Sequence, residues 1–236
     1  MLRYNDKDAY NSKNIDKNAK RYLNDESSLD TSFYILNNEY TNYANIIGKR
    51  KSVDECKFTS AFKPEDEKVI CRCFYKLSRK NKCINCPHYG LMNKYVIDNY
   101  EVLDYELPTA RGSKRNVDLI LKDNEGKVLF VEVNPKSSDE SLLRMCFEIL
   151  TYTSVLNYWV SKKNEQIFRY LKEKLNLEEP FTFSKAIMFF KGSKQEEIWN
   201  DCHSEIYTKQ IIKKHSIDVL CIEENEKKKY SIKKVN

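Results

Sequence analysis

Two apolar runs on either side of a short polar segment constrain the fold of this chain more than any other feature. Residues 117–121 and 128–133 are apolar apart from one acidic position in each, and Gly126 lies in the segment between them. Runs of five or six such residues have the length of ordinary strands. Because glycine readily adopts the positive φ that a tight turn needs, the pattern predicts a β-hairpin.

The hairpin predicts a pair of facing carboxylates. If Asp123 faces Lys127 across the turn, the same register brings Asp118 opposite Glu132. Side chains alternate between the two faces of a strand, so Asn134 shares a face with Glu132. Like charges directly opposite each other destabilise a sheet. A positively charged group, most simply a divalent metal ion, is therefore expected beside them.

These residues resemble the signature of the PD-(D/E)XK nuclease superfamily, in which an Asp, a spacer and a Glu-X-Lys triplet lie on a β-hairpin. Asp118 matches the Asp, and Glu132-Val133-Asn134 matches the triplet, except that Asn134 stands where the family has lysine. The helical pattern that follows is similar to the corresponding helix of the RecB-like branch. The resemblance covers residues 100–191 and implies metal-dependent hydrolysis of nucleic-acid phosphodiester bonds, with DNA as the expected partner.

The resemblance further implies an α/β fold with a mixed sheet and a restriction-endonuclease-like αβββαβ core. A helix over residues 30–48 would precede the sheet, and Glu39 on it is either an extra acidic ligand or a solvated side chain. Hydrophobic periodicity and turn residues predict the remaining elements. They are a strand over 95–107 ended by Pro108, the hairpin, a helix over 138–159 capped by Ser138 or Asp139, a strand over 183–191, a helix over 195–215, and strands over 217–222 and 229–234.

Candidate catalytic residues follow from the same resemblance: Asp118, Glu132, Asn134 and Lys136. Asp118, Glu132 and the backbone carbonyl of Val133 would hold Mg²⁺ or Mn²⁺, hard ions that prefer oxygen ligands. Such an ion lowers the pKa of a bound water and neutralises charge on the scissile phosphate. Asn134 cannot supply the charge of a lysine, although its amide can orient water, and Lys136 would have to swing back along its flexible stem. The alternative is a catalytically inactive nuclease fold that binds nucleic acid or protein.

A cysteine cluster precedes the hairpin and predicts a small metal-binding module, residues 56–90, inserted before the sheet. Cys71, Cys73, Cys83 and Cys86 have the number and spacing of a tetrahedral zinc site. Cys56 or His88 can replace one ligand. An iron–sulfur cluster, disulfides, or cysteines that only pack in the core are the alternatives.

Phosphate contacts are expected from a basic loop and from one helix. Arg111, Lys114 and Arg115 lie in the loop that leads into the first hairpin strand, where they can hold a nucleic-acid backbone; a solvated turn is the alternative. Arg144 and Glu148 lie four residues apart on the helix after the hairpin. They either pair at the surface or assist phosphate or metal binding.

Composition and length favour one domain of ordinary size. The resemblance implies that it is a nuclease-like domain, residues 29–236, preceded by a polar segment, residues 1–28, that is loosely ordered unless it docks. The chain has 236 residues, 41% of them hydrophobic, and a net charge of +6, a mild excess that favours contact with phosphates. No apolar run is long enough to span a membrane, and the start lacks a secretory segment, so a cytoplasmic location is expected. A structural zinc protein without a nucleic-acid partner is a third possibility.

Overall fold

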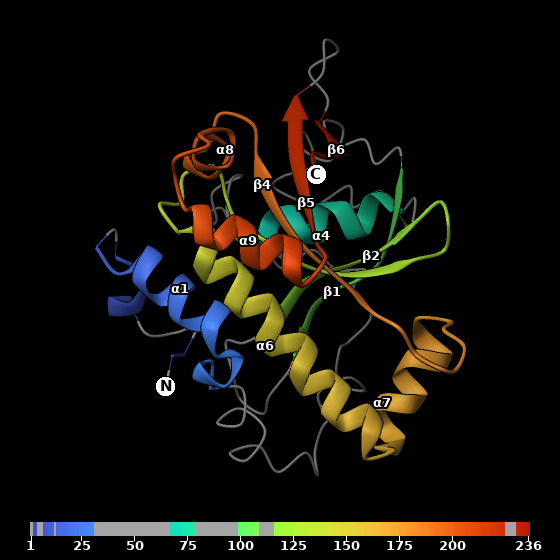
Figure 1. The fold of residues 1–236 in the computed structure, drawn as a ribbon. Helices are drawn as coiled ribbons and strands as arrows, with labels where there is room; N and C mark the ends of the chain where they lie inside the picture. The colour runs from blue at the N-terminus through green and yellow to red at the C-terminus, as the bar shows by residue number, and fades with distance from the viewer. Residues whose placement is uncertain are drawn as a thin grey trace.

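The protein has a mixed α/β fold built on a six-stranded mixed sheet (Figure 1). The computed structural model describes residues 2–3, 7–11, 13–30, 67–78, 99–108, 116–224 and 230–236. The expected helix over 30–48 lies outside these residues except for its first position. The cysteine pair at 83 and 86 and the basic loop with Arg111, Lys114 and Arg115 also lie outside them.

The sheet combines two antiparallel ends with a parallel centre. Strands β1 to β3 form an antiparallel meander, β3, β4 and β5 run parallel to one another, and β6 returns antiparallel to β5. The spatial order follows the chain. The strands are β1 (Tyr100–Pro108), β2 (Asn116–Asp123), β3 (Val128–Val133), β4 (Ser184–Phe190), β5 (Ile217–Glu224) and β6 (Tyr230–Lys234).

The predicted hairpin and its register are confirmed. Leu119 pairs with Val131 in the β2–β3 ladder, which is the register in which Asp118 faces Glu132. The backbone N–H of Asp123 donates to the carbonyl of Lys127 at 3.0 Å, closing the turn. Gly126 has a φ of 87°, the positive value for which glycine was expected there.

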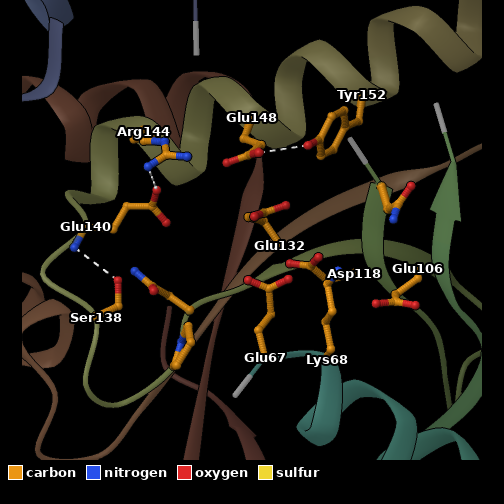
Figure 2. Close-up of a pocket in the computed structure, with 13 residues that line it drawn as sticks. Glu67, Lys68, Glu106, Asp118, Glu132, Ser138, Glu140, Arg144, Glu148 and Tyr152 are labelled. Carbon is orange, nitrogen blue, oxygen red and sulfur yellow. Dashed lines mark hydrogen bonds and ion pairs between the residues drawn. The ribbon is translucent and has the colours of Figure 1, made fainter. Parts of the chain in front are cut away.

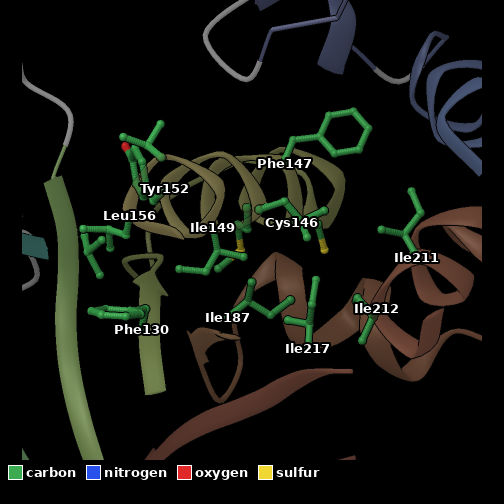
Figure 3. Packing of buried hydrophobic residues seen from close by; sticks show 14 of the residues in the cluster. Phe130, Cys146, Phe147, Ile149, Tyr152, Leu156, Ile187, Ile211, Ile212 and Ile217 are labelled. Carbon is green, nitrogen blue, oxygen red and sulfur yellow. The ribbon is translucent and has the colours of Figure 1, made fainter. Parts of the chain in front are cut away.

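Helices cover both faces of the sheet. On one face lie α6 (Leu142–Ser161), α9 (Ile206–Lys214) and α1 (Ile15–Asn24), and on the other lies α4 (Glu67–Ser78) (Figure 1). Figure 3 shows the core between α6, α9 and the sheet, where Ile149 and Leu156 lie near Phe130 and Ile187. The alternate strand residues, such as Leu129 and Val131, pack against α4. A sheet with two buried faces explains why its strands read as nearly continuous apolar runs.

Two predicted helix boundaries are corrected. Helix α6 begins after Ser141, whose Oγ accepts a hydrogen bond from the backbone N–H of Arg144 at 3.2 Å, and not after Ser138 or Asp139. The helix expected over 195–215 is two helices, α8 (Lys194–Asn200) and α9. The chain breaks between them because Glu205 adopts a left-handed conformation with a φ of 43°.

The segment 1–28, expected to be loosely ordered unless docked, is in part docked. Helix α1 packs on α9, and its Tyr22 ring lies 5.0 Å from the ring of Phe147 in α6. Ala19 on the same face is fully buried. A short α7 (Glu165–Arg169) follows α6. Among the described residues, no helix combines the length and apolarity needed to cross a membrane.

Candidate functional site

A polar cavity of about 350 Å³ lies between α4, the β2–β3 hairpin and the start of α6 (Figure 2). The hairpin contributes the facing acidic residues that the sequence predicted, and the two helices contribute further carboxylates from opposite sides. Six of the residues that line the cavity are acidic and two are basic. The lining consists of Glu67, Lys68, Glu106, Asn116, Asp118, Glu132, Asn134, Pro135, Ser138, Glu140, Arg144, Glu148 and Tyr152.

Asp118 and Glu132 form the buried centre of the cavity. The Oδ2 atom of Asp118 accepts a hydrogen bond of 2.7 Å from the backbone N–H of Val133, which fixes one carboxylate against the opposite strand. The Oε2 atom of Glu132 is buried without a hydrogen-bond partner among the described residues. Burial, followed by the charge of Glu67, raises the pKa of Asp118 well above its ordinary value. Burial and the charge of Asp118 do the same to the pKa of Glu132.

Glu67 is a member of the site that sequence reasoning missed. It lies in the first turn of α4, and its charge is the second cause, after burial, of the raised pKa of Asp118. Burial is the main cause that raises the pKa of Glu67. In Figure 2 its side chain points to the same space as Asp118 and Glu132. The only sequence feature that could have indicated Glu67 is its position among acidic residues just before an apolar helical pattern. Acidic residues are equally common at the solvent-exposed start of an ordinary helix.

Helix α6 supplies the opposite wall. The hydroxyl of Tyr152 donates to Oε1 of Glu148 at 2.7 Å, so the orientation of this buried carboxylate is fixed. Burial and then the charge of Glu140 raise the pKa of Glu148 to about 7. Arg144 forms an ion pair with Glu140 (Figure 2), and the ion pair between Arg144 and Glu148, one of the two alternatives expected, is not formed. Arg144 and Glu148 both line the cavity, which is the position that a role in phosphate or metal binding requires.

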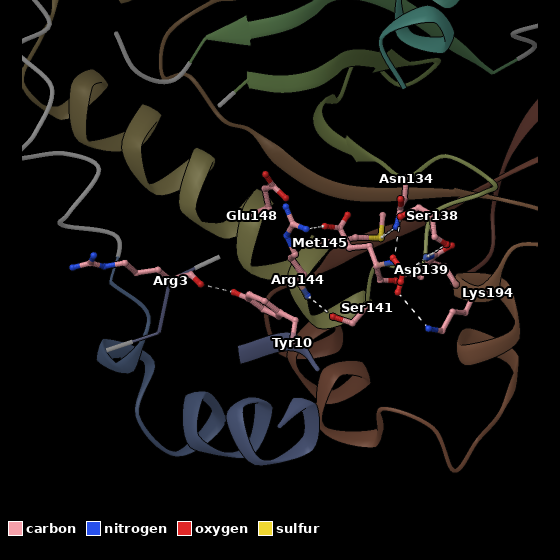
Figure 4. Close-up of polar contacts among 12 residues, drawn as sticks. Arg3, Tyr10, Asn134, Ser138, Asp139, Ser141, Arg144, Met145, Glu148 and Lys194 are labelled. Carbon is pink, nitrogen blue, oxygen red and sulfur yellow. Dashed lines mark hydrogen bonds and ion pairs between the residues drawn. The ribbon is translucent and has the colours of Figure 1, made fainter. Parts of the chain in front are cut away.

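The two residues considered for the role of the family's lysine lie in different environments. Asn134 lines the cavity and is almost fully buried, and its Nδ2 contacts Sδ of Met145 at 3.7 Å (Figure 4). Lys136 does not line the cavity. Its Nζ lies beside Gly192, so close that a Cβ added to this glycine would be 3.4 Å from it. Neither residue gives the cavity a positive charge.

The carboxylates that line the cavity are suitable ligands for a hard cation, although they are not close enough together to coordinate one as they stand. Carboxylate oxygens are the preferred ligands of Mg²⁺ and Mn²⁺, and the unpartnered Oε2 of Glu132 is free to accept one more contact. Within the described part of the chain, no group of three or more His, Cys, Asp or Glu side chains has the arrangement of a metal site as it stands. A bound ion would therefore require Asp118, Glu132 and Glu67 to close in on it.

The cysteine prediction is tested only in part. Cys71 and Cys73 are buried in α4 among apolar side chains of the sheet. Being two residues apart, they point in directions about 200° apart around the helix axis. Their observed surroundings are those of packing residues, and Cys83 and Cys86 lie outside the described residues. The zinc site stays a prediction.

No protein-family model, no curated protein and no solved structure matches this chain. Inference about its activity therefore depends on the geometry and chemistry of the cavity itself. The features that bear most on it are the hairpin with Asp118 and Glu132, the third carboxylate from α4, and the hydrogen-bonded Glu148 on α6.

Proposed function

We propose that this protein is a metal-dependent nuclease that hydrolyses phosphodiester bonds of DNA in the carboxylate-lined cavity. One observation carries the proposal: Asp118 and Glu132 are buried together at the end of a hairpin, and neither forms an ion pair with a described Lys, Arg or His side chain. Burying carboxylates costs free energy unless they are protonated or bound to a cation. A site that keeps such carboxylates buried despite the cost in free energy is a candidate for an active site or a binding site.

The order of elements supports a restriction-endonuclease-like core. Helix α4 precedes the antiparallel strands β1 to β3, α6 follows them, and β4 adds parallel to β3. This is the αβββαβ order expected from the resemblance of Asp118 and Glu132-Val133-Asn134 to the PD-(D/E)XK signature. Among the described residues, the helix that precedes the sheet is α4, which lies in the segment where the cysteine-rich module was expected.

Each wall of the cavity has a distinct chemical task. Asp118, Glu132 and Glu67 supply the oxygen ligands for Mg²⁺ or Mn²⁺, which when bound neutralises charge at the scissile phosphate. Glu148 is held by Tyr152 and can accept the proton of the attacking water, because a base with a pKa near the operating pH is the most effective. The water oxygen then bonds to phosphorus as the bond to the leaving oxygen breaks.

A cleavage assay tests the proposal. The substrates are end-labelled single-stranded, double-stranded and branched DNA, each incubated with the protein and Mg²⁺, Mn²⁺ or EDTA. Asp118→Asn and Glu132→Gln preserve shape while removing charge, and Glu125→Gln is the matched control on the exposed turn of the same hairpin. We expect cleavage only with metal, a loss of at least about 100-fold in the two cavity variants, and full activity in the control. Cleavage that persists in Asp118→Asn, or none on any substrate, contradicts the proposal.

A second candidate function, a nuclease fold that binds nucleic acid without cleaving it, is favoured by Asn134. Its amide packs against Met145, and Lys136 lies beside Gly192 and does not line the cavity, so the usual source of positive charge is missing. This candidate predicts DNA binding that is unaffected by EDTA and by Asp118→Asn and that weakens steeply with salt. Fluorescence anisotropy of labelled DNA at several salt concentrations separates the two candidates.

A further inference from the structure

When its carboxyl groups are ionised, as metal binding requires, the cavity has an excess of negative charge that opposes the entry of a phosphodiester. Six acidic and two basic side chains line it, and a phosphodiester brings one more negative charge. A divalent ion offsets only part of this excess. Charges in a partly buried cavity are poorly screened, so a fixed cation close to the phosphate has a large effect there.

Among the described residues, three others that were considered as sources of positive charge are not available for this task. Arg144 is committed to its ion pair with Glu140 on the rim formed by α6. Lys136 lies against Gly192, outside the lining. Asn134 is neutral, and its amide contacts Met145.

Lys68 differs from these residues in position and in bonding. It is the second residue of α4 and lies next to Glu67, and its side chain lines the cavity and extends toward Asp118 (Figure 2). The residue is exposed, and among the described residues it forms no ion pair. A long, flexible ammonium that already points into the cavity can meet an incoming phosphate oxygen without breaking a bond to the protein.

We propose that Lys68 is a catalytic residue that contacts a non-bridging oxygen of the scissile phosphate and supplies the positive charge missing at Asn134. The inference rests on the proposed nuclease function. The ammonium keeps its proton throughout, and it stabilises the negative charge that grows on the phosphate oxygens while the water oxygen bonds to phosphorus and the leaving oxygen departs. The cation therefore comes from a helix on the other side of the cavity and not from the hairpin.

Four variants test this inference in the cleavage assay with saturating Mn²⁺. Lys68→Met should lower kcat by roughly 100-fold or more, and Lys68→Arg should retain most of the activity because it keeps the charge. Lys17→Met makes the same change on the exposed surface of α1 and should have no effect. Lys136→Met tests the rival lysine. Activity of Lys68→Met within about threefold of the wild type, or a loss in Lys136→Met alone, overturns the inference.

Mn²⁺ binding, measured by titration calorimetry, separates catalysis from structure. Lys68→Met should bind Mn²⁺ at least as tightly as the wild type, because it removes a competing positive charge, whereas Glu132→Gln should bind it weakly. Loss of both binding and cleavage in Lys68→Met would indicate a collapsed site and reject the role. If the wild type and Asp118→Asn are equally inert, the nuclease function fails and this inference with it. If the wild type cleaves DNA and Asp118→Asn does not, the nuclease function holds, and the Lys68 variants then test only the role of Lys68.

Discussion

Replacing Glu148 with glutamine should stabilise the metal-free protein at pH 8. The carboxyl group is buried, and its pKa is raised from 4.5 to about 7, mainly by burial and then by the charge of Glu140. Glutamine has nearly the same shape, and its side-chain oxygen can still accept the hydrogen bond from Tyr152. The substitution therefore removes the cost of the buried charge and little else.

The size and sign of the effect follow from proton linkage. Between pH 4.5 and about 7 the folded protein keeps a proton on Glu148 that the unfolded chain has lost, so the free energy of unfolding falls as the pH rises. Each pKa unit corresponds to about 1.4 kcal/mol, and the whole shift to roughly 3 kcal/mol. Glu148→Gln should thus match the wild type near pH 4.5 and exceed its stability by roughly 3 kcal/mol at pH 8.

Thermal unfolding in EDTA between pH 4.5 and 8, followed by circular dichroism, measures this difference. For a chain of this size, 3 kcal/mol corresponds to a rise in Tm of roughly 6–12 °C. Glu125→Gln on the exposed hairpin turn controls for loss of an acidic residue and should change stability by less than about 0.5 kcal/mol. A constant difference between Glu148→Gln and the wild type at every pH would refute the argument that a buried charge causes it.

Three other outcomes are expected from the same structure. Added Mn²⁺ should raise the Tm at pH 8 and have little effect at pH 5, because metal and protons compete for the cavity carboxylates. Equal shifts in Tm at both pH values in a thermal scan would contradict this prediction. Tyr170→Phe removes the 2.6 Å hydrogen bond to buried Asp104 and should cost about 1–3 kcal/mol in urea unfolding, and a smaller loss would mean that other contacts of Asp104 suffice. Ser141→Ala should cost about 1 kcal/mol by removing the cap of α6, with an unchanged urea midpoint as the contrary result.

The hairpin was predictable because local chemistry determines it. Gly126 closes the turn at a positive φ, and the strands on each side have the length and composition of buried strands, so the register of Asp118 and Glu132 follows from the sequence. The start of α6 was not predictable in the same way. Ser138 and Ser141 are both good caps, and tertiary contacts decide between them: the carbonyl of Ser138 accepts a hydrogen bond from Gln195, far along the chain.

The part of the site that the sequence could not predict comes from elements distant in the chain. Glu67 and Lys68 lie about fifty residues before Asp118, and no local pattern relates them to it. They reach the cavity because the apolar face of α4, with Phe74 fully buried, packs on β1 and β2. Residues that line a site from a separate helix become identifiable only once the packing of that helix is known.

The position of β3 also affects how the chain can be made. In the finished protein every residue of Val128–Val133 is buried, and one edge of the strand is covered by β4 in parallel. During synthesis that edge stays bare until the next 57 residues, from Asn134 to Phe190, have emerged, which takes roughly 3 to 11 seconds at 5–20 residues per second. A short apolar strand with an open edge is prone to pair with other chains. Glu132 lies within this strand, so the acidic residue at the centre of the cavity also places a charge in an apolar segment that is open to aggregation before the fold is complete.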